Sequence, residues 1–220
     1  MIKAVFFDLD GTLYDRDALV LRIVKEQFSI FQKELQGLSE THFVQRILEL
    51  DDHGYGDKSE LYGKVTREWG LQSEISERLV DHFWSSYDRN CQLDDDTLGT
   101  LQTLRAHDKK LGVITNGGTM RQRQKLECLG LESFFDAVLI SEAEGVSKPD
   151  PTIFKMAAER CGVNSRESAF VGDHPEVDVA GSGAAGFISI WKRVPYWKMR
   201  FENVHIVDSL SEIIPICLAG

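Results

Sequence analysis

The chain lacks any apolar run near the ~20 residues that a membrane-spanning helix needs. It also lacks a Lys/Arg-rich run, because 35 acidic residues outnumber 25 basic residues and give a net charge of -10. A nucleic-acid or anionic-membrane partner would require a basic surface. We therefore expect no nucleic-acid partner and no membrane partner, and small molecules are favoured instead.

Cysteine is scarce and scattered. The four cysteines show no C-x-x-C spacing and no accompanying histidine cluster, so neither a zinc site nor a disulfide framework is predicted; they are Cys91, Cys128, Cys161 and Cys217. A signal-peptide pattern is also missing, because Asp8 and Asp10 interrupt the first apolar run. We expect a cytoplasmic protein with reduced thiols, as a monomer or a homodimer.

Strand and helix patterns alternate through most of the chain. Short continuous apolar runs predict buried parallel strands at residues 4–7, 111–115, 137–140, 168–171 and 187–191. Helical patterns between them cover residues 98–107, 120–129, 152–161 and 178–185. This alternation predicts an α/β fold with a doubly wound parallel sheet.

Residues 15–90 break the alternation. Apolar residues recur there at helical spacing, as in Leu19, Ile23 and Val24, and no convincing strand is present. We therefore expect two domains: an α/β core made of residues 1–14 and 91–220, and an all-helical domain at 15–90 inserted after the first strand.

Asp8 and Asp10 follow the first apolar run at i, i+2 spacing, which places both side chains on one face of a strand. Two interpretations compete. The carboxylates could cap the turn at Gly11-Thr12, or they could bind a divalent metal with one of them acting as a nucleophile. Taken alone, the pair favours the capping role, and the other motifs reverse that preference.

Polar residues also follow the other predicted strands. In an open α/β sheet, ligands bind beyond the carboxyl ends of the strands, so these residues should meet in space. They are Thr115-Asn116-Gly117-Gly118, Ser147-Lys148-Pro149, Gly172-Asp173 and Asp178. Carboxylates without Cys or His partners suit a hard cation such as Mg²⁺, and Thr115, Lys148 and the amides of residues 116–118 could neutralise phosphoryl oxygens.

Four motifs in order resemble the haloacid dehalogenase-like hydrolase superfamily over essentially the whole chain. They are Asp8-Leu9-Asp10-Gly11-Thr12, Ile114-Thr115-Asn116-Gly117, Lys148-Pro149-Asp150-Pro151, and the segment from Gly172 to Asp178. The resemblance implies a Rossmann-like core and a helical cap in which specificity would lie between about Tyr14 and Asp88.

The resemblance also implies a role for each motif residue. Asp8 would attack phosphorus, and Asp10 would protonate the leaving oxygen and later activate water. Thr115, Asn116, Gly117 and Lys148 would bind the substrate phosphate. The Mg²⁺ ligands would be Asp8, the Asp10 main-chain carbonyl and Asp173, with Asp178 in direct contact or behind them.

These observations predict a Mg²⁺-dependent phosphatase that acts on a small soluble phosphorylated metabolite through an aspartyl-phosphate. Two alternatives remain: a phosphomutase of the same superfamily, and a non-enzymatic regulatory protein that accepts a phosphoryl group. The helical insertion and the acid Asp10 argue against the regulatory protein, and the presence of Asp10 also favours phosphoester chemistry over dehalogenation.

One further motif resembles a dinucleotide-binding sequence but lacks the required context. Residues Gly181 to Gly186 match G-x-G-x-x-G, which is typical of dinucleotide sites when it directly follows a strand. Here an Asp-rich loop intervenes after the strand that ends near Val171. We interpret the small residues as packing a helix against the sheet.

Overall fold

The computed structural model describes residues 1–54, 56–199, 201 and 204–219. The chain divides into two compact units. One comprises Met1–Asp15 with Gln92–Gly220, and we call it the α/β unit; the other, Arg16–Cys91, is the helical unit.

Within the described residues, the α/β unit contains one six-stranded sheet with the order β3-β2-β1-β4-β5-β6. The strands are β1 (Ala4–Phe7), β2 (Lys110–Thr115), β3 (Ala137–Ile140), β4 (Ser168–Gly172), β5 (Ile188–Lys192) and β6 (His205–Val207). Every pair is parallel. The predicted doubly wound α/β fold is therefore confirmed, whereas β6 was not predicted.

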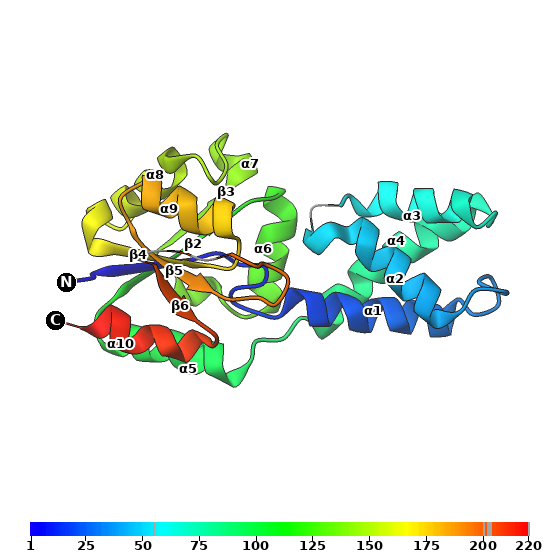
Figure 1. Cartoon of the computed structure of the whole chain (residues 1–220), viewed down its shortest axis with the longest axis horizontal. Helices are drawn as coiled ribbons and strands as arrows, with labels where there is room; N and C mark the ends of the chain where they lie inside the picture. The colour runs from blue at the N-terminus through cyan, green and yellow to red at the C-terminus, as the bar shows by residue number, and fades with distance from the viewer. Residues whose placement is uncertain (55, 200, 202–203, 220) are drawn as a thin grey trace. The chain divides into compact units, whose positions relative to one another are not determined.

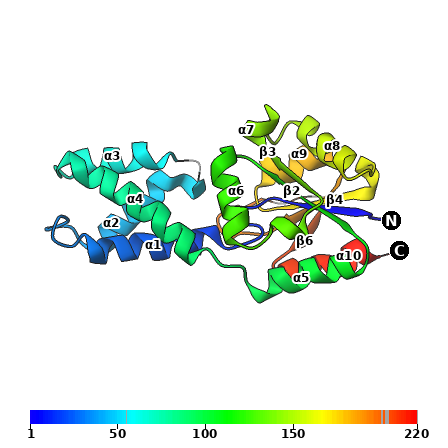
Figure 2. The same cartoon turned by 180° about the vertical axis from the view of Figure 1, so that it is seen from behind.

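Helices cover both faces of this sheet. The helices α8 (Pro151–Arg160) and α9 (Gly181–Ala184) lie on one face, and α5 (Asp95–Ala106) and α10 (Ile213–Leu218) lie on the other (Figures 1 and 2). The remaining helical elements of this unit are α6 (Thr119–Cys128), α7 (Ser141–Glu144), η2 (Glu132–Phe134), η3 (Ser165–Glu167), η4 (Pro175–Ala180) and η5 (Leu210–Glu212).

The core beneath α8 is aromatic. Phe154 of α8 packs edge-on against Phe170 of β4, with ring centroids 5.0 Å apart, and it also contacts Phe187. All three side chains are buried, as is Phe6 of β1. Burial of each such ring contributes about 1.5–3 kcal/mol to folding, so this layer fixes the central strands that end at the polar motifs.

Local signals in the sequence set the helix starts. The Asp94 side chain accepts a hydrogen bond from the Thr97 N–H at 2.6 Å and begins α5, and Asp150 accepts from Thr152 N–H at 2.8 Å ahead of Pro151 in α8. Side chains of this kind satisfy donors that have no partner within the helix. At α8, this bond ties the start of the helix to the loop that carries the third motif.

The predicted helix at 178–185 differs from the structure. The chain forms a wide π-type turn, η4, before the short α9. The N–H groups of Asp178 and Val179 both donate to the His174 carbonyl, at 3.0 and 3.2 Å, and this sharing widens the turn. Widened turns of this kind occur frequently at functional sites.

The helical unit consists of α1 (Arg16–Ile30), α2 (Glu40–Asp51), η1 (Asp52–Gly54), α3 (Lys58–Glu68) and α4 (Ser73–Asn90). Figure 1 shows these elements in blue to green. Gln27 of α1 joins three helices, because its Nε2 donates to the Leu79 carbonyl at 2.8 Å and its Oε1 accepts from the Tyr62 hydroxyl at 2.6 Å. The predicted all-helical insertion is confirmed as a fold, although α3 was not recognised in the sequence.

Among the described residues, we find no helix with the length and apolarity to span a bilayer.

Candidate active site

The sheet brings the sequence motifs to one edge. Strand β1 lies between β2 and β4, and Phe7 is aligned with Val113 on one side and Val171 on the other. Because all three strands are parallel, their carboxyl ends coincide, and the residues that follow them emerge together. The motif residues Asp8, Thr115 and Asp173 come from these three ends.

Lys148 lies between two of the predicted carboxylates. Its Nζ donates to Asp8 Oδ1 at 2.5 Å and to Asp178 Oδ1 at 2.7 Å. All three side chains are buried. The second oxygen of Asp178 accepts a hydrogen bond from the His174 N–H at 3.0 Å, so both of its oxygens are engaged by groups of the protein.

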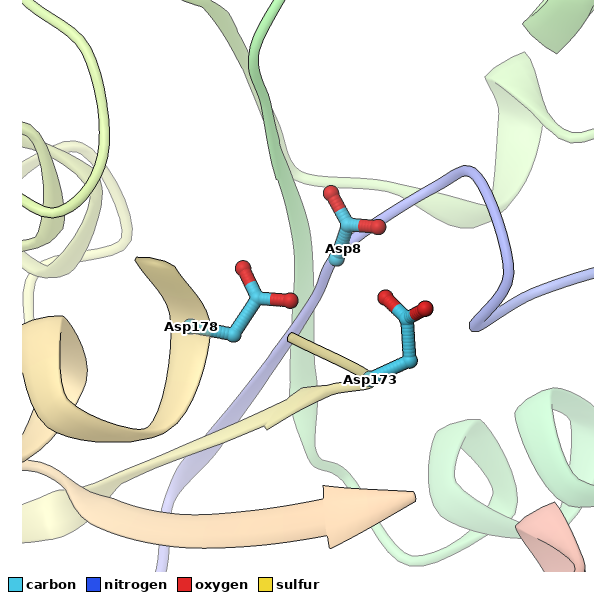
Figure 3. A group of neighbouring side chains, drawn as sticks. All are labelled: Asp8, Asp173 and Asp178. Carbon is cyan, nitrogen blue, oxygen red and sulfur yellow. The ribbon is translucent and has the colours of Figure 1, made fainter. Parts of the chain in front are cut away.

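Three buried carboxylates could hold a metal ion. One oxygen from each of Asp8, Asp173 and Asp178 lies within 4.8 Å of the others, and Figure 3 shows the three side chains as neighbours. Their all-oxygen character suits a hard divalent cation. The side chain of Asp10 does not belong to this group, so a contribution from its main-chain carbonyl stays a prediction.

The electrostatics of the cluster reflect this crowding. Burial raises the pKa of Asp8 to about 7 despite the opposing charge of Lys148, and burial together with the charge of Asp178 raises the pKa of Asp173 to about 8. Burial lowers the pKa of the Lys148 ammonium, but Asp178 and Asp8 outweigh that effect and raise it overall. A protonated lysine amid several carboxylates leaves excess negative charge, which a bound cation would offset.

Asp173 is fixed from several sides. The Trp191 Nε1 donates to the Asp173 main-chain carbonyl at 2.8 Å, and the Tyr196 hydroxyl donates to its Oδ2 at 3.4 Å. Gly11 has φ +83°, and a Cβ there would lie 2.6 Å from Asp173 Oδ2. The glycine of the first motif is therefore required both by its left-handed backbone and by the proximity of Asp173.

The Asp10 side chain contacts residues other than the three clustered carboxylates. The Lys125 Nζ donates to both of its carboxylate oxygens at 2.7 Å, and the Gln122 Nε2 donates to Oδ2 at 3.0 Å. The Tyr14 hydroxyl also donates to Oδ1. Tyr14, expected to mark the start of the specificity region, thus lies in the α/β unit and contacts a motif residue.

The second motif is linked to the third. The Asn116 Nδ2 donates to the Lys148 carbonyl and its Oδ1 accepts from the Lys148 N–H, both at 2.9 Å. The Gly117 N–H donates to Ser141 Oγ at 2.9 Å. The Asn116 side chain therefore holds the backbone of Lys148 in position. Direct contact of Asn116 or Gly117 with substrate stays a prediction.

The glycine-rich segment from Gly181 to Gly186 packs against the loop that carries Lys148. A Cβ at Gly181 would lie 2.9 Å from the Pro149 Cα, so only glycine allows α9 to approach this closely. Pro149 directly follows Lys148, and the peptide bond between them is cis. The small residues thus pack a helix against the loop that carries Lys148.

Sequence reasoning missed several residues of this region. Gln122, Lys125, Trp191 and Tyr196 all contact motif residues, yet none belongs to a recognised motif. One signal was present, because Gln122 and Lys125 have the i, i+3 spacing that places two side chains on one face of a helix.

Comparisons with known proteins identify the family of this chain. The family model described as haloacid dehalogenase-like hydrolase matches residues 2–186. The chain is 38% identical over 218 residues to glyceraldehyde 3-phosphate phosphatase of Pyrococcus furiosus, with 97% of this chain and 90% of that protein covered. It is 32% identical over 209 residues to the protein of the same name from Methanopyrus kandleri, with 92% and 89% covered.

A solved structure shows the same fold over the full length. The crystal structure of a HAD phosphatase from Thermococcus onnurineus matches with a TM-score of 0.69 and 27% identity, covering 100% of this chain and 99% of that chain. Family match, relatives and fold therefore agree with the four motifs. The chain is an enzyme, and it belongs to the haloacid dehalogenase-like hydrolase family.

Proposed function

We propose that this enzyme is a Mg²⁺-dependent phosphatase that hydrolyses a small phosphorylated metabolite through an aspartyl-phosphate on Asp8. The observation that carries the proposal is the buried Asp8 carboxylate, whose Oδ1 accepts from Lys148 Nζ at 2.5 Å beside the carboxylates of Asp173 and Asp178. The phosphatase names of the relatives support the reaction class.

The donor set fits a divalent metal. When ionised, the carboxylates of Asp8, Asp173 and Asp178 exceed the single ammonium of Lys148 by two negative charges, and uncompensated buried charge is costly. Mg²⁺ prefers oxygen ligands and keeps positions for water and substrate phosphate. Bound by Asp8 and Asp173, it would supply positive charge to the phosphoryl oxygens.

We assign Asp178 to the support of Lys148. One of its oxygens accepts from Lys148 and the other from the His174 N–H, at 2.7 and 3.0 Å. Since both oxygens are engaged by the protein, Asp178 would hold the lysine in place behind the metal ligands. Such supporting contacts typically tune a site without touching the metal.

In the first step, an Asp8 carboxylate oxygen attacks phosphorus in line with the ester oxygen of the substrate. The P–O bond to the leaving group breaks, and Asp10 transfers a proton to that oxygen, which leaves as an alcohol. Lys148 and the Thr115 hydroxyl would bind the phosphoryl oxygens as charge redistributes.

In the second step, a water molecule attacks the phosphorus of the aspartyl-phosphate. Asp10, now a carboxylate, accepts the proton of that water, and the bond between phosphorus and the Asp8 oxygen breaks. Inorganic phosphate forms, and Asp8 returns to its carboxylate state. The two carboxylates therefore alternate roles without any net change in the enzyme.

We propose small sugar phosphates as the most favoured class of substrate. Both relatives described above are named as glyceraldehyde 3-phosphate phosphatases. The helical unit, Arg16–Cys91, would act as the cap that excludes bulk water and contributes substrate contacts. Fold alone does not select the substrate, so the proposal extends to other small phosphorylated acids and nucleoside monophosphates.

The test is phosphate release from a panel of phosphorylated sugars, organic acids and nucleoside monophosphates, with Mg²⁺ and with chelator. Asp8→Asn serves as the blank, because it preserves side-chain size and removes the nucleophile. We expect metal-dependent turnover that is absent in Asp8→Asn and highest for glyceraldehyde 3-phosphate or a close analogue.

Two results would contradict the proposal. Phosphate release that persists in Asp8→Asn would remove the nucleophile assignment. Exchange between isomeric sugar phosphates in the presence of a bisphosphate, without phosphate release, would instead identify a phosphomutase.

A further inference from the structure

The side chain of Asp10 contacts helix α6. This helix begins at Thr119, directly after the second motif, and places Gln122 and Lys125 one turn apart on the same face. Both residues reach Asp10 although 112 and 115 positions separate them from it in the sequence. The acid–base group of the proposed reaction is thus held by residues outside all four motifs.

Gln122 also joins Asp10 to the predicted phosphate ligand. Its Nε2 donates both to Asp10 Oδ2, at 3.0 Å, and to Thr115 Oγ1, at 2.5 Å. Gln122 is only 3% exposed, so these bonds are shielded from water. A single amide group therefore sets the separation between the group that would handle the proton and the group that would bind the phosphate.

Lys125 restricts the carboxylate from a second direction. Its Nζ lies 2.7 Å from both Asp10 oxygens, a bidentate contact that fixes the plane of the carboxylate. The Lys125 side chain is 13% exposed and the Asp10 side chain 23% exposed, so water screens this ion pair less than an exposed one. The Tyr14 hydroxyl adds a further contact to Oδ1.

We propose that Gln122 and Lys125 are positioning residues that orient Asp10 toward the leaving-group oxygen in line with the phosphate held at Thr115. The inference rests on the proposed phosphatase function. Neither side chain needs to touch the substrate. Their effect acts through the direction of the Asp10 carboxylate, because proton transfer requires the donor within hydrogen-bond reach of the accepting oxygen.

This role has a chemical signature that a purely structural role lacks. An alkoxide is a poor leaving group and needs a proton as it departs, whereas p-nitrophenolate departs without one. The value of kcat/KM covers only the steps up to departure of the leaving group, so it excludes the later action of Asp10 on water. Misorientation of Asp10 should therefore reduce kcat/KM much more for an alkyl phosphate than for p-nitrophenyl phosphate.

The experiment measures kcat/KM for both substrates in the full-length enzyme with saturating Mg²⁺. The alkyl phosphate is the best member of the panel described above. The variants are Lys125→Met, Gln122→Leu, the conservative Lys125→Arg, and Arg123→Met as a matched control. Arg123 is an exposed residue of the same helix. Melting curves verify that each variant is folded.

We expect Lys125→Met and Gln122→Leu to lower kcat/KM at least about 10-fold more for the alkyl phosphate than for p-nitrophenyl phosphate. Lys125→Arg should recover most of that difference, and Arg123→Met should show none. If Lys125→Met does not fold, Gln122→Leu and Lys125→Arg provide the comparison.

Equal losses on both substrates in an active enzyme would overturn the positioning role and leave the phosphatase function standing. A wild-type enzyme without metal-dependent release from either substrate would overturn the proposed function and this inference together. The two failures are therefore distinguished by the wild-type measurement.

Discussion

The Lys148 ammonium lies 2.5 Å from Asp8 Oδ1, although 140 positions separate the two residues in the sequence. The contact exists because β1 is a central strand and because the Asn116 side chain holds the Lys148 backbone from the neighbouring strand end. Asp8 and Asp178 thus share one buried cation, and this relationship determines how the site responds to substitution.

Loss of that cation should destabilise the metal-free protein. Lys148→Met leaves Asp8 and Asp178 buried without their partner, and breaking a buried pair costs about 3–5 kcal/mol. Mg²⁺ should recover part of this loss by supplying positive charge. Urea unfolding with chelator and with Mg²⁺ measures both effects, with the exposed Lys155→Met as control. Unchanged stability with chelator present would contradict this interpretation.

The stability of the metal-free protein should fall as pH rises from about 5 to 8. Burial raises the folded-state pKa of Asp8 and Asp173 to about 7 and about 8, from 3.8 in the unfolded chain. Between those values the native state binds more protons than the unfolded state, so deprotonation lowers the free energy of unfolding, by a few kcal/mol in order of magnitude. Urea midpoints across this pH range test the slope.

Added Mg²⁺ should reverse this trend, because carboxylates bind metal in their deprotonated form. The increase in unfolding free energy caused by Mg²⁺ should therefore be larger at pH 8 than at pH 6. The double variant Asp8→Asn with Asp173→Asn is the control, and it should show neither the slope nor the Mg²⁺ effect. A steep pH slope that persists in the double variant would assign the titration to other groups.

Asp173 and Tyr196 should differ in their effects on the metal. Asp173→Asn removes a proposed ligand, and we expect the Mg²⁺ concentration needed for half-maximal activity to rise by more than about 100-fold. Tyr196→Phe removes only a 3.4 Å hydrogen bond to Asp173 Oδ2, so its effect should stay below about 10-fold. Mg²⁺ titrations of activity make the comparison. If the two variants need the same Mg²⁺ concentration as wild type, Asp173 is not a ligand.

The helical unit contains a buried ion cluster of its own. The carboxylate of Asp51 accepts from Arg16, at 2.9 Å, and pairs with Lys58 at 2.6 Å, and all three residues are buried. Asp51→Ala would remove the carboxylate that both buried cations share, while Arg16 would keep its ion pair with Asp17 at 3.0 Å, and the loss should cost about 3–5 kcal/mol of stability. Chemical denaturation followed by tryptophan fluorescence measures the loss. The exposed Asp81→Ala should be near neutral, and an equally neutral Asp51→Ala would contradict the role of the cluster.

The sequence predicts the central part of the fold well for a physical reason. The strands β1, β2 and β4 are buried on both faces, so they read as continuous apolar runs, and the polar motifs follow directly at their carboxyl ends. Strand β6 was missed because it is a three-residue strand at the edge of the sheet, with His205 and Ile206 exposed. Nothing in so short and mixed a segment favours a strand.

Only those residues of the site that belong to a sequence motif could be predicted from the sequence. Helix α6 is polar on almost every side and buries only Gln122 and Leu126, so the i, i+3 spacing of Gln122 and Lys125 puts them on one face without indicating that this face meets Asp10. Tyr196 lies in the loop after β5, and its contact with Asp173 depends on how that loop folds. Contacts of this kind depend on tertiary structure, whereas motif spacing depends only on the ends of neighbouring strands.

Mass spectrometry of enzyme quenched in acid during turnover would detect the proposed aspartyl-phosphate on Asp8 itself. We predict that the peptide containing Asp8 gains the mass of one phosphoryl group, that borohydride reduction converts this acyl phosphate to homoserine, and that the Asp8→Asn enzyme shows neither change. An enzyme that releases phosphate while the modification is found on another residue, or while Asp8→Asn remains active, would contradict this prediction.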